Sequence, residues 1–244
     1  MAIPSPAGRR AFVRRQTRLQ EVAEVPGMRL HLADDVSALW HRTGEFLGLA
    51  DPPLPYWAFA WSGGLGIARY LLDHPATVEG RSVVDVGTGS GLCAIVAARL
   101  GAASVQAVDV DPLAAAAVEL NVRENRVRVG FSGRDLLDEP PPDRDVVLAG
   151  DVSYEGPMAE RMTAWLRAAA ANGTRVLIGD PGRAYLPDGL ERVATYQVQT
   201  SREIEEGEST AATVYTFSNT AESDAHPVNA IRGAGRFDGE SQLV

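Results

Sequence analysis

A glycine-rich segment between a predicted strand and a predicted helix constrains the fold more than any other feature of this sequence. The segment reads Val84-Asp-Val-Gly-Thr-Gly-Ser-Gly91; it begins within an apolar run at 82–86 and leads into an alanine-rich helix at 92–100. Glycines are needed where a backbone turns sharply and approaches a ligand closely. Such a turn at the carboxyl end of a buried strand is typical of open α/β sheets with a ligand at the sheet edge.

Strands and helices alternate from about residue 80 onward. Apolar runs predict strands at 82–86, 104–108, 127–131, 145–149 and 175–178, and helices are predicted at 92–100, 112–125 and 158–171. Alternating patterns at 193–200 and 211–217 predict a closing antiparallel hairpin. Helices of this length between parallel strands form right-handed crossovers. The sequence therefore predicts an α/β fold with a doubly wound, mostly parallel, seven-stranded Rossmann-like sheet.

The chain divides into four segments by pattern. Residues 1–10 are expected to be a flexible N-terminus, and 11–78 a helical extension that covers the cofactor site, with an extended piece at 28–32 and a helix at 65–72. Residues 79–218 carry the alternating pattern. Residues 219–244 lack hydrophobic periodicity, so a disordered tail is expected there, because such a stretch cannot bury enough apolar surface to offset its ordering entropy.

Composition excludes several classes of protein. No run approaches the roughly 18–20 apolar residues of a membrane helix. Cys93 is the single cysteine, which excludes a disulfide framework, and the four histidines are too scattered for a metal site. The net charge of −9 argues against a nucleic-acid partner. All 23 basic residues are arginines, so the chain has no lysine for phosphate binding or Schiff-base chemistry.

The N-terminal arginines bear on location. Five arginines lie between residues 9 and 18, before the first acidic residue, which resembles an organelle transit peptide in composition. The segment has no apolar signal core, and it continues without a break into patterned sequence. The sequence therefore favours a bacterial cytoplasmic protein over a mitochondrial one, and we expect a monomer.

The glycine segment favours one kind of ligand. Gly87, Gly89 and Gly91 depart from the Gly-x-Gly-x-x-Gly spacing of dinucleotide sites, because the third glycine comes one residue early. Asp85, directly before them, is unfavourable beside a pyrophosphate. A carboxylate at this point suits a ligand with an ammonium group, such as the amino-acid end of S-adenosylmethionine.

Two further carboxylates follow predicted strands. Asp109 ends the strand at 104–108, where it can accept from both hydroxyls of a ribose. Asp135 follows the strand at 127–131; it can accept from an adenine amino group while the Leu136 backbone N–H donates to the ring, and the alternative is an aspartate in a turn. Asp111 is expected to cap the next helix. Together these spacings predict S-adenosylmethionine as the cofactor.

The strand at 145–149 leads to Gly150-Asp-Val-Ser-Tyr154. Because this edge faces the bound ligand, Asp151 and Tyr154 should border the methyl donor; the alternative for Asp151 is a cap of the helix at 158. Asp180 is assigned to loop structure, and the alternative is that it lines the same mouth. The aromatic run Tyr56-Trp-Ala-Phe-Ala-Trp61 suits a core, although its place before Ser62-Gly-Gly64 also allows it to cover the cofactor pocket.

Five segments resemble one family. They are Phe12-Val-Arg-Arg-Gln-Thr-Arg-Leu19, Arg29-Leu-His-Leu-Ala33, Tyr56-Trp-Ala-Phe-Ala-Trp-Ser-Gly-Gly64, Ala68-Arg-Tyr-Leu-Leu-Asp-His-Pro75 and Gly179-Asp-Pro-Gly-Arg183. Together they resemble the bacterial relatives of the electron transfer flavoprotein β-subunit lysine methyltransferase, which are seven-strand family 16 methyltransferases. The resemblance covers roughly residues 11–218, and the tryptophan-rich segment is its most specific part.

The resemblance implies that 79–218 is a class I methyltransferase domain acting on a protein that presents a lysine. The target would be the electron transfer flavoprotein β-subunit, a ribosomal protein such as L7/L12, or both. It implies that Asp151 and Tyr154, the family's Asp-x-x-Tyr signature, bind and orient the lysine and that Trp61 borders the donor. Three alternatives stay open: a small-molecule, nicotinamide-like amine N-methyltransferase, an RNA methyltransferase and a non-catalytic S-adenosylmethionine-binding protein.

Overall fold

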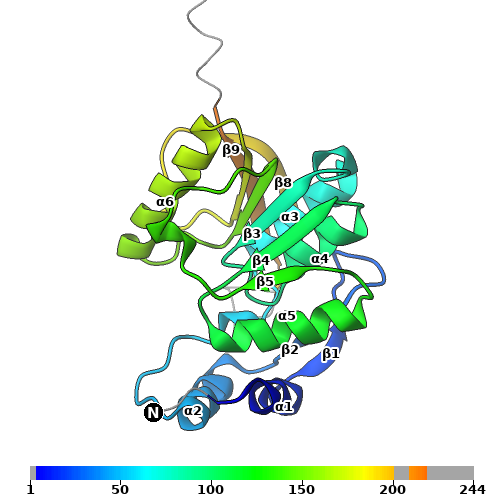
Figure 1. Cartoon of the computed structure of the whole chain (residues 1–244), viewed down its shortest axis with the longest axis vertical. Helices are drawn as coiled ribbons and strands as arrows, with labels where there is room; N and C mark the ends of the chain where they lie inside the picture. The colour runs from blue at the N-terminus through cyan, green and yellow to red at the C-terminus, as the bar shows by residue number, and fades with distance from the viewer. Residues whose placement is uncertain (1–3, 201–208, 219–244) are drawn as a thin grey trace, which may run out of the picture.

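The computed structural model describes residues 4–200 and 209–218 and is built on a seven-stranded sheet (Figure 1). Its strands are β3 (Ser82–Val86), β4 (Ser104–Val108), β5 (Gly130–Ser132), β6 (Val146–Gly150), β7 (Arg175–Asp180), β8 (Leu190–Gln199) and β9 (Ser209–Phe217). They are arranged in the order β5-β4-β3-β6-β7-β9-β8, and β9 is antiparallel to both of its neighbours. The predicted doubly wound, mostly parallel seven-stranded fold is confirmed.

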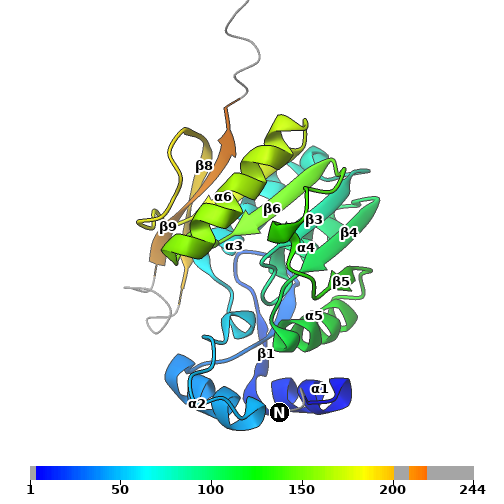
Figure 2. The same cartoon turned by 60° about the vertical axis from the view of Figure 1, so that its left-hand side comes forward.

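Helices cover both faces of the sheet (Figure 2). α3 (Ser62–Asp73) and α4 (Leu92–Arg99) pack on one face, and α6 (Gly156–Ala171) packs on the other. Side chains of a strand alternate between the two layers, so Val83 joins the cluster with α3 and α4 whereas Val84 joins the cluster with α6. This alternation explains why the central strands read as continuous apolar runs.

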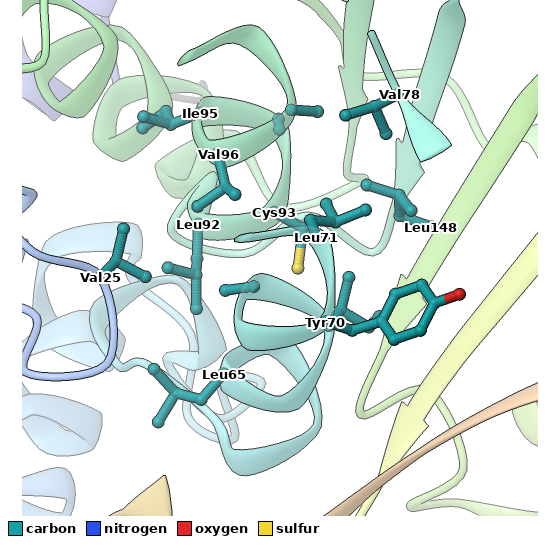
Figure 3. Packing of buried hydrophobic residues seen from close by; sticks show 14 of the residues in the cluster. Val25, Leu65, Tyr70, Leu71, Val78, Leu92, Cys93, Ile95, Val96 and Leu148 are labelled. Carbon is teal, nitrogen blue, oxygen red and sulfur yellow. The ribbon is translucent and has the colours of Figure 1, made fainter. Parts of the chain in front are cut away.

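Cys93 lies in the layer between α3 and α4. Its side chain is 4% exposed and sits among Leu71, Leu92 and Leu148 (Figure 3). Burial raises the pKa of the Cys93 thiol well above its ordinary value. The thiol therefore serves as a small buried apolar group.

The N-terminal segment packs beyond α5 (Pro112–Glu124) at one end of the molecule (Figure 1). It consists of α1 (Pro6–Gln16), a hairpin of β1 (Arg18–Glu21) with β2 (Arg29–Leu32), and α2 (Val36–Leu47). Asn121 of α5 and Asn125, the C-cap residue of the same helix, fasten the hairpin. Asn121 accepts a 2.7 Å hydrogen bond from the backbone N–H of His31, and Asn125 donates a 2.7 Å bond to the Arg29 carbonyl.

The structure departs from the expected segments in two places. Residues 6–10 are helical rather than flexible, because Ser5 caps α1 by accepting from the Gly8 N–H at 3.2 Å. The expected helical extension at 11–78 also contains the β1–β2 hairpin, and its last helix, α3, packs on the main sheet. The tail expected at 219–244 lies outside the described residues. Within the described ranges, no helix combines the length and apolar character required to cross a membrane.

Candidate active site

A cavity of about 880 Å³ opens at the carboxyl ends of β3, β4 and β6. This is the edge at which α/β sheets bind ligands. Nine of the ten residues predicted for the site line the cavity: Trp61, Asp85, Gly87, Gly89, Asp109, Asp135, Leu136, Asp151 and Tyr154. The topology therefore gathers residues that lie up to 93 positions apart in the sequence, counting from Trp61 to Tyr154.

Gly91 is the exception among the predicted residues. It does not line the cavity; it caps the start of α4 at a φ of +85°, and a Cβ atom there would come within 3.2 Å of Val118 on α5. A glycine is required at position 91 because the φ is positive and because α5 packs closely against this position. Gly89 does line the cavity; its φ is +52°, and a Cβ atom there would lie 3.4 Å from the Tyr56 carbonyl oxygen.

Asp85 lies at the floor of the cavity and is 2% exposed. Its Oδ2 accepts hydrogen bonds from the Thr88 hydroxyl at 2.5 Å and from the Ala94 backbone N–H at 3.0 Å. Burial raises the pKa of Asp85 to about 7, against the effect of these two donors. No cation within the described part of the chain pairs with it, so a cationic ligand group would favour its ionised form.

Asp109 follows β4 and stands beside the glycine turn. Its two oxygens accept from the backbone N–H groups of Gly89 and Asp111, each at 2.9 Å, and burial raises the pKa of its carboxyl. These bonds fix the carboxylate at the cavity wall and leave lone pairs for hydroxyl donors. Asp111 caps α5 by accepting from the Leu113 N–H at 2.7 Å, as predicted.

Asp135 caps a short helix, η3 (Leu136–Asp138), by accepting from the Leu137 N–H at 3.0 Å. Its other oxygen is 3.1 Å from Arg161 Nη2. The hydrogen bonds of Asp135 are therefore those of an aspartate in a turn, the alternative stated from the sequence. Asp135 and Leu136 nevertheless both line the cavity.

Asp151 is held by the N-terminus of α3. Its carboxylate accepts from the backbone N–H groups of Gly63 at 3.1 Å and Gly64 at 2.8 Å, and the residue is 9% exposed with a φ of +58°. Helix N-termini favour negative charge. The alternative role as a cap of α6 is wrong, because the N-cap position of that helix is Glu155.

Paired glycines allow α3 to approach the sheet so closely. A Cβ atom on Gly63 would lie 2.1 Å from the Gly179 carbonyl oxygen, and one on Gly150 would lie 2.9 Å from the Cα of Gly64. Any side chain at these positions would push the helix off the sheet. The glycines of Ser62-Gly-Gly64 therefore allow the backbone of α3 to contact the sheet. This contact places the N-terminus of α3 beside Asp151.

Arg183 is the site residue that sequence reasoning missed. Its Nη1 lies 2.6 Å from Asp151 Oδ1 and 3.4 Å from Asp180 Oδ2. Asp180 is fully buried and accepts from the backbone N–H groups of Gly182 at 2.7 Å and Arg183 at 2.6 Å, so it forms the loop as predicted and also aims the guanidinium. The only sequence signal for Arg183 was its place in the Gly179-Asp-Pro-Gly-Arg183 segment.

An aromatic cluster covers the mouth of the cavity. The rings of Tyr56 and Tyr154 are 4.6 Å apart, and Trp61 donates a 2.9 Å hydrogen bond to the Tyr56 carbonyl. Tyr154 is 41% exposed. Burial of its ring and its hydrogen bond to Tyr56 raise the pKa of the Tyr154 phenol, so the hydroxyl stays protonated at neutral pH. Trp57, from the same run, is instead a core residue that is 1% exposed.

Metal binding finds no support at this site. Among residues 4–200 and 209–218, no group of three or more His, Cys, Asp and Glu side chains is arranged to hold a metal ion.

Comparison with known proteins agrees with the fold. The family model of ribosomal protein L11 methyltransferase (PrmA) matches residues 70–151. The crystal structure of PH1948 from Pyrococcus horikoshii, described as a candidate RNA methyltransferase, aligns with a TM-score of 0.52 at 16% identity, covering 69% of this chain and 90% of that one. The fold is that of class I methyltransferases, the class of enzymes that uses S-adenosylmethionine.

Sequence relatives identify the family. The electron transfer flavoprotein beta subunit lysine methyltransferase of Xenopus laevis is 34% identical, and the match covers 85% of this chain and 86% of the relative. The human protein of the same name is 33% identical, with 85% and 81% covered. The chain belongs to the electron transfer flavoprotein β-subunit lysine methyltransferase family.

Proposed function

We propose that this enzyme transfers a methyl group from S-adenosylmethionine to a lysine side chain of the electron transfer flavoprotein β-subunit. The observation that carries the proposal is the shape of the cavity: an open apolar mouth leads to the buried Asp151. Leu49, Leu54 and Tyr154 line this mouth and are 48%, 43% and 41% exposed. A long flexible side chain can reach the floor while its parent protein rests on the apolar rim.

The carboxylates of the β3–β4–β5 side suit the cofactor. Asp85 would hold the amino-acid ammonium, Asp109 would accept from the ribose hydroxyls, and Asp135 with the Leu136 N–H would bind the adenine. Gly87 and Gly89 let the backbone approach, and Trp61 borders the methyl donor. The fit rests on the buried Asp85 and the half-buried Asp109, two carboxylates that, within the described part of the chain, are held by neutral donors.

The acceptor lies on the β6–β7 side in this proposal. When bound, S-adenosylmethionine supplies an electrophilic methyl group on a sulfonium. The neutral lysine amine attacks that carbon, so the new N–C bond forms as the C–S bond breaks with its electron pair left on sulfur, and the proton of the amine leaves to solvent. Tyr154 and Tyr56 flank the aliphatic chain of the lysine. Asp151 holds α3 and Arg183 in place beside it. Positioning of this kind supplies much of the rate of a displacement.

Three further properties belong to the same proposal. The enzyme works as a monomer in the cytoplasm, and its partner is a protein rather than a nucleic acid or a membrane. The net charge of −9 supports a protein partner, because an acidic surface repels phosphate backbones. Size-exclusion chromatography with light scattering and a DNA- and RNA-binding titration check these points.

Mass spectrometry of candidate substrates tests the proposal. The purified enzyme is incubated with S-adenosylmethionine and, in separate reactions, with electron transfer flavoprotein, ribosomal proteins L11 and L7/L12, and nicotinamide. We expect methylation of a lysine in the β-subunit of the flavoprotein, abolished when that lysine is replaced by arginine. Methylation of a ribosomal protein alone would show that the substrate is that protein and not the flavoprotein. Methylation of nicotinamide alone would overturn protein-lysine transfer.

A further inference from the structure

The buried carboxylate of the Asp-x-x-Tyr signature already has a cationic partner. Arg183 Nη1 lies 2.6 Å from Asp151 Oδ1, and the guanidinium is 21% exposed at the cavity wall. The Asp180 carboxylate holds Arg183 from behind: its Oδ2 pairs with the guanidinium, and its Oδ1 accepts from the Arg183 backbone N–H. Because arginine does not lose its proton in proteins, this positive charge is permanent.

We propose that Arg183 is a positioning residue that cancels the charge of Asp151 and so keeps the acceptor lysine in its neutral, nucleophilic form. The inference rests on the proposed lysine methylation and adds a residue to it. It also changes the part assigned to Asp151, which holds Arg183 and α3 in place rather than serving as a bare counter-ion for the lysine.

The physical reason is the protonation state of the amine. Free lysine has a pKa near 10.4, and only its neutral form can attack. An uncompensated carboxylate beside the amine would stabilise the ammonium and raise that pKa further. An Asp151–Arg183 pair presents almost no net charge, so the amine that reaches the donor loses its proton more easily.

Other charged and titratable groups around the pair do not replace Arg183. Tyr56 from η1 (Tyr56–Ala58) and Tyr154 have raised pKa values and stay neutral. Cys93 of α4 is also neutral because burial raises its pKa. The remaining neighbours are acids: Asp85, Asp109, Glu155 and Asp180.

Two more arginines line the cavity, but both have partners elsewhere. Arg134 pairs with Glu139, and Arg161 pairs with Asp135 and Asp138. Among the described residues, Arg183 is therefore the arginine whose charge is set against Asp151.

The pH dependence of the chemical step tests the inference. Single-turnover methylation is measured at saturating S-adenosylmethionine and saturating electron transfer flavoprotein, from pH 6.5 to 10, because rates in the bound complex report the pKa of the bound amine. We expect Arg183→Gln to move the midpoint of this profile up by about one pH unit. Arg183→Lys keeps the charge and should keep the wild-type midpoint.

Two further variants, one that removes the opposite charge and one that removes both charges, sharpen the test. Asp151→Asn removes one of the two carboxylates that share Arg183, so the midpoint of its residual activity should move down. The double variant Asp151→Asn/Arg183→Gln removes both charges and should return to the wild-type midpoint, which also covers the case in which Arg183→Gln alone does not fold. The matched control is Arg192→Gln, an exposed arginine on β8 outside the cavity, which should leave rate and midpoint unchanged.

Two kinds of failure are distinguishable. A folded Arg183→Gln that loses rate with no change of midpoint, or a double variant with a displaced midpoint, would overturn the charge-cancelling role and leave the proposed function intact. A wild-type enzyme that methylates no lysine in any of the tested proteins at any pH would instead overturn the proposed function.

Discussion

The two sides of the cavity hold their carboxylates in different ways. On the β3–β4 side, Asp85 and Asp109 are fixed by neutral donors, a threonine hydroxyl and backbone N–H groups of neighbouring loops. On the β6–β7 side, Asp151 and Asp180 share a guanidinium, and Asp151 also receives the N-terminus of α3.

This difference assigns separate tasks to the two sides. Buried carboxylates without a counter-ion are unfavourable until a cationic or hydroxyl-bearing ligand arrives, so the β3–β4 side is prepared to bind. On the β6–β7 side the Arg183 guanidinium already offsets the charge of Asp151, so this pair fixes geometry rather than attracts charge. The experiments below test whether binding and methyl transfer separate along this line.

The largest expected effect is on methyl transfer in Asp151→Asn. The amide cannot match both the glycine N–H groups and Arg183, so the acceptor side should lose its geometry, and single-turnover methylation should fall by about 100-fold or more. S-adenosylmethionine affinity, measured by calorimetry, should change by less than about 1 kcal/mol. Near-normal turnover would remove Asp151 from the methyl-transfer site.

The contact of α3 with the sheet is tested by Gly63→Ala. Since the new Cβ would lie 2.1 Å from the Gly179 carbonyl oxygen, the variant should lose about 3 kcal/mol of unfolding free energy or more. Denaturant unfolding measures the loss. The matched control, Gly8→Ala in the exposed first turn of α1, should be neutral or stabilising by up to about 1 kcal/mol. Equal stability of the two variants would contradict the close contact.

The binding side is tested by Asp109→Ala. Loss of a charged acceptor should weaken S-adenosylmethionine binding by about 1.5–3 kcal/mol for each ribose hydrogen bond, with a smaller effect on the rate at saturating cofactor. Calorimetry on the folded variant gives the affinity, and Asp143→Ala, an exposed aspartate outside the cavity, is the control. Unchanged affinity would contradict the ribose assignment.

The smallest expected effect is a pH dependence of stability without cofactor. The pKa of Asp85 is about 7 in the folded protein, against 3.8 ordinarily, so the folded state holds a proton that the unfolded state has released between these values. The stabilising contribution of this proton is therefore lost as pH rises through about 7. From pH 8 to pH 6, the wild type should gain about 1 kcal/mol relative to Asp85→Asn in denaturant unfolding. A constant difference between the two proteins would show that Asp85 is ionised throughout.

Local pattern was enough to predict the framework of the fold. The strands at 82–86 and 104–108 match the predicted bounds, because short apolar runs between turn residues have few other ways to be buried. The glycine turn after β3 and the acids after β4 and β6 were predicted for a related reason. Parallel strands end at one edge, so a residue just past a strand is brought to the cavity wherever its strand lies in the sheet.

Only the tertiary structure decided which partners these residues meet. Asp151 and Arg183 are 32 positions apart and are joined through the ends of β6 and β7, and nothing in the local sequence around either residue indicates the other. The same holds for the β1–β2 hairpin, whose four-residue strands are fastened by asparagines of α5, and for Gly91, whose neighbour is a valine of that helix. Local propensity and burial act within a few residues, whereas ion pairs and backbone contacts depend on chain segments that meet only after the sheet has formed.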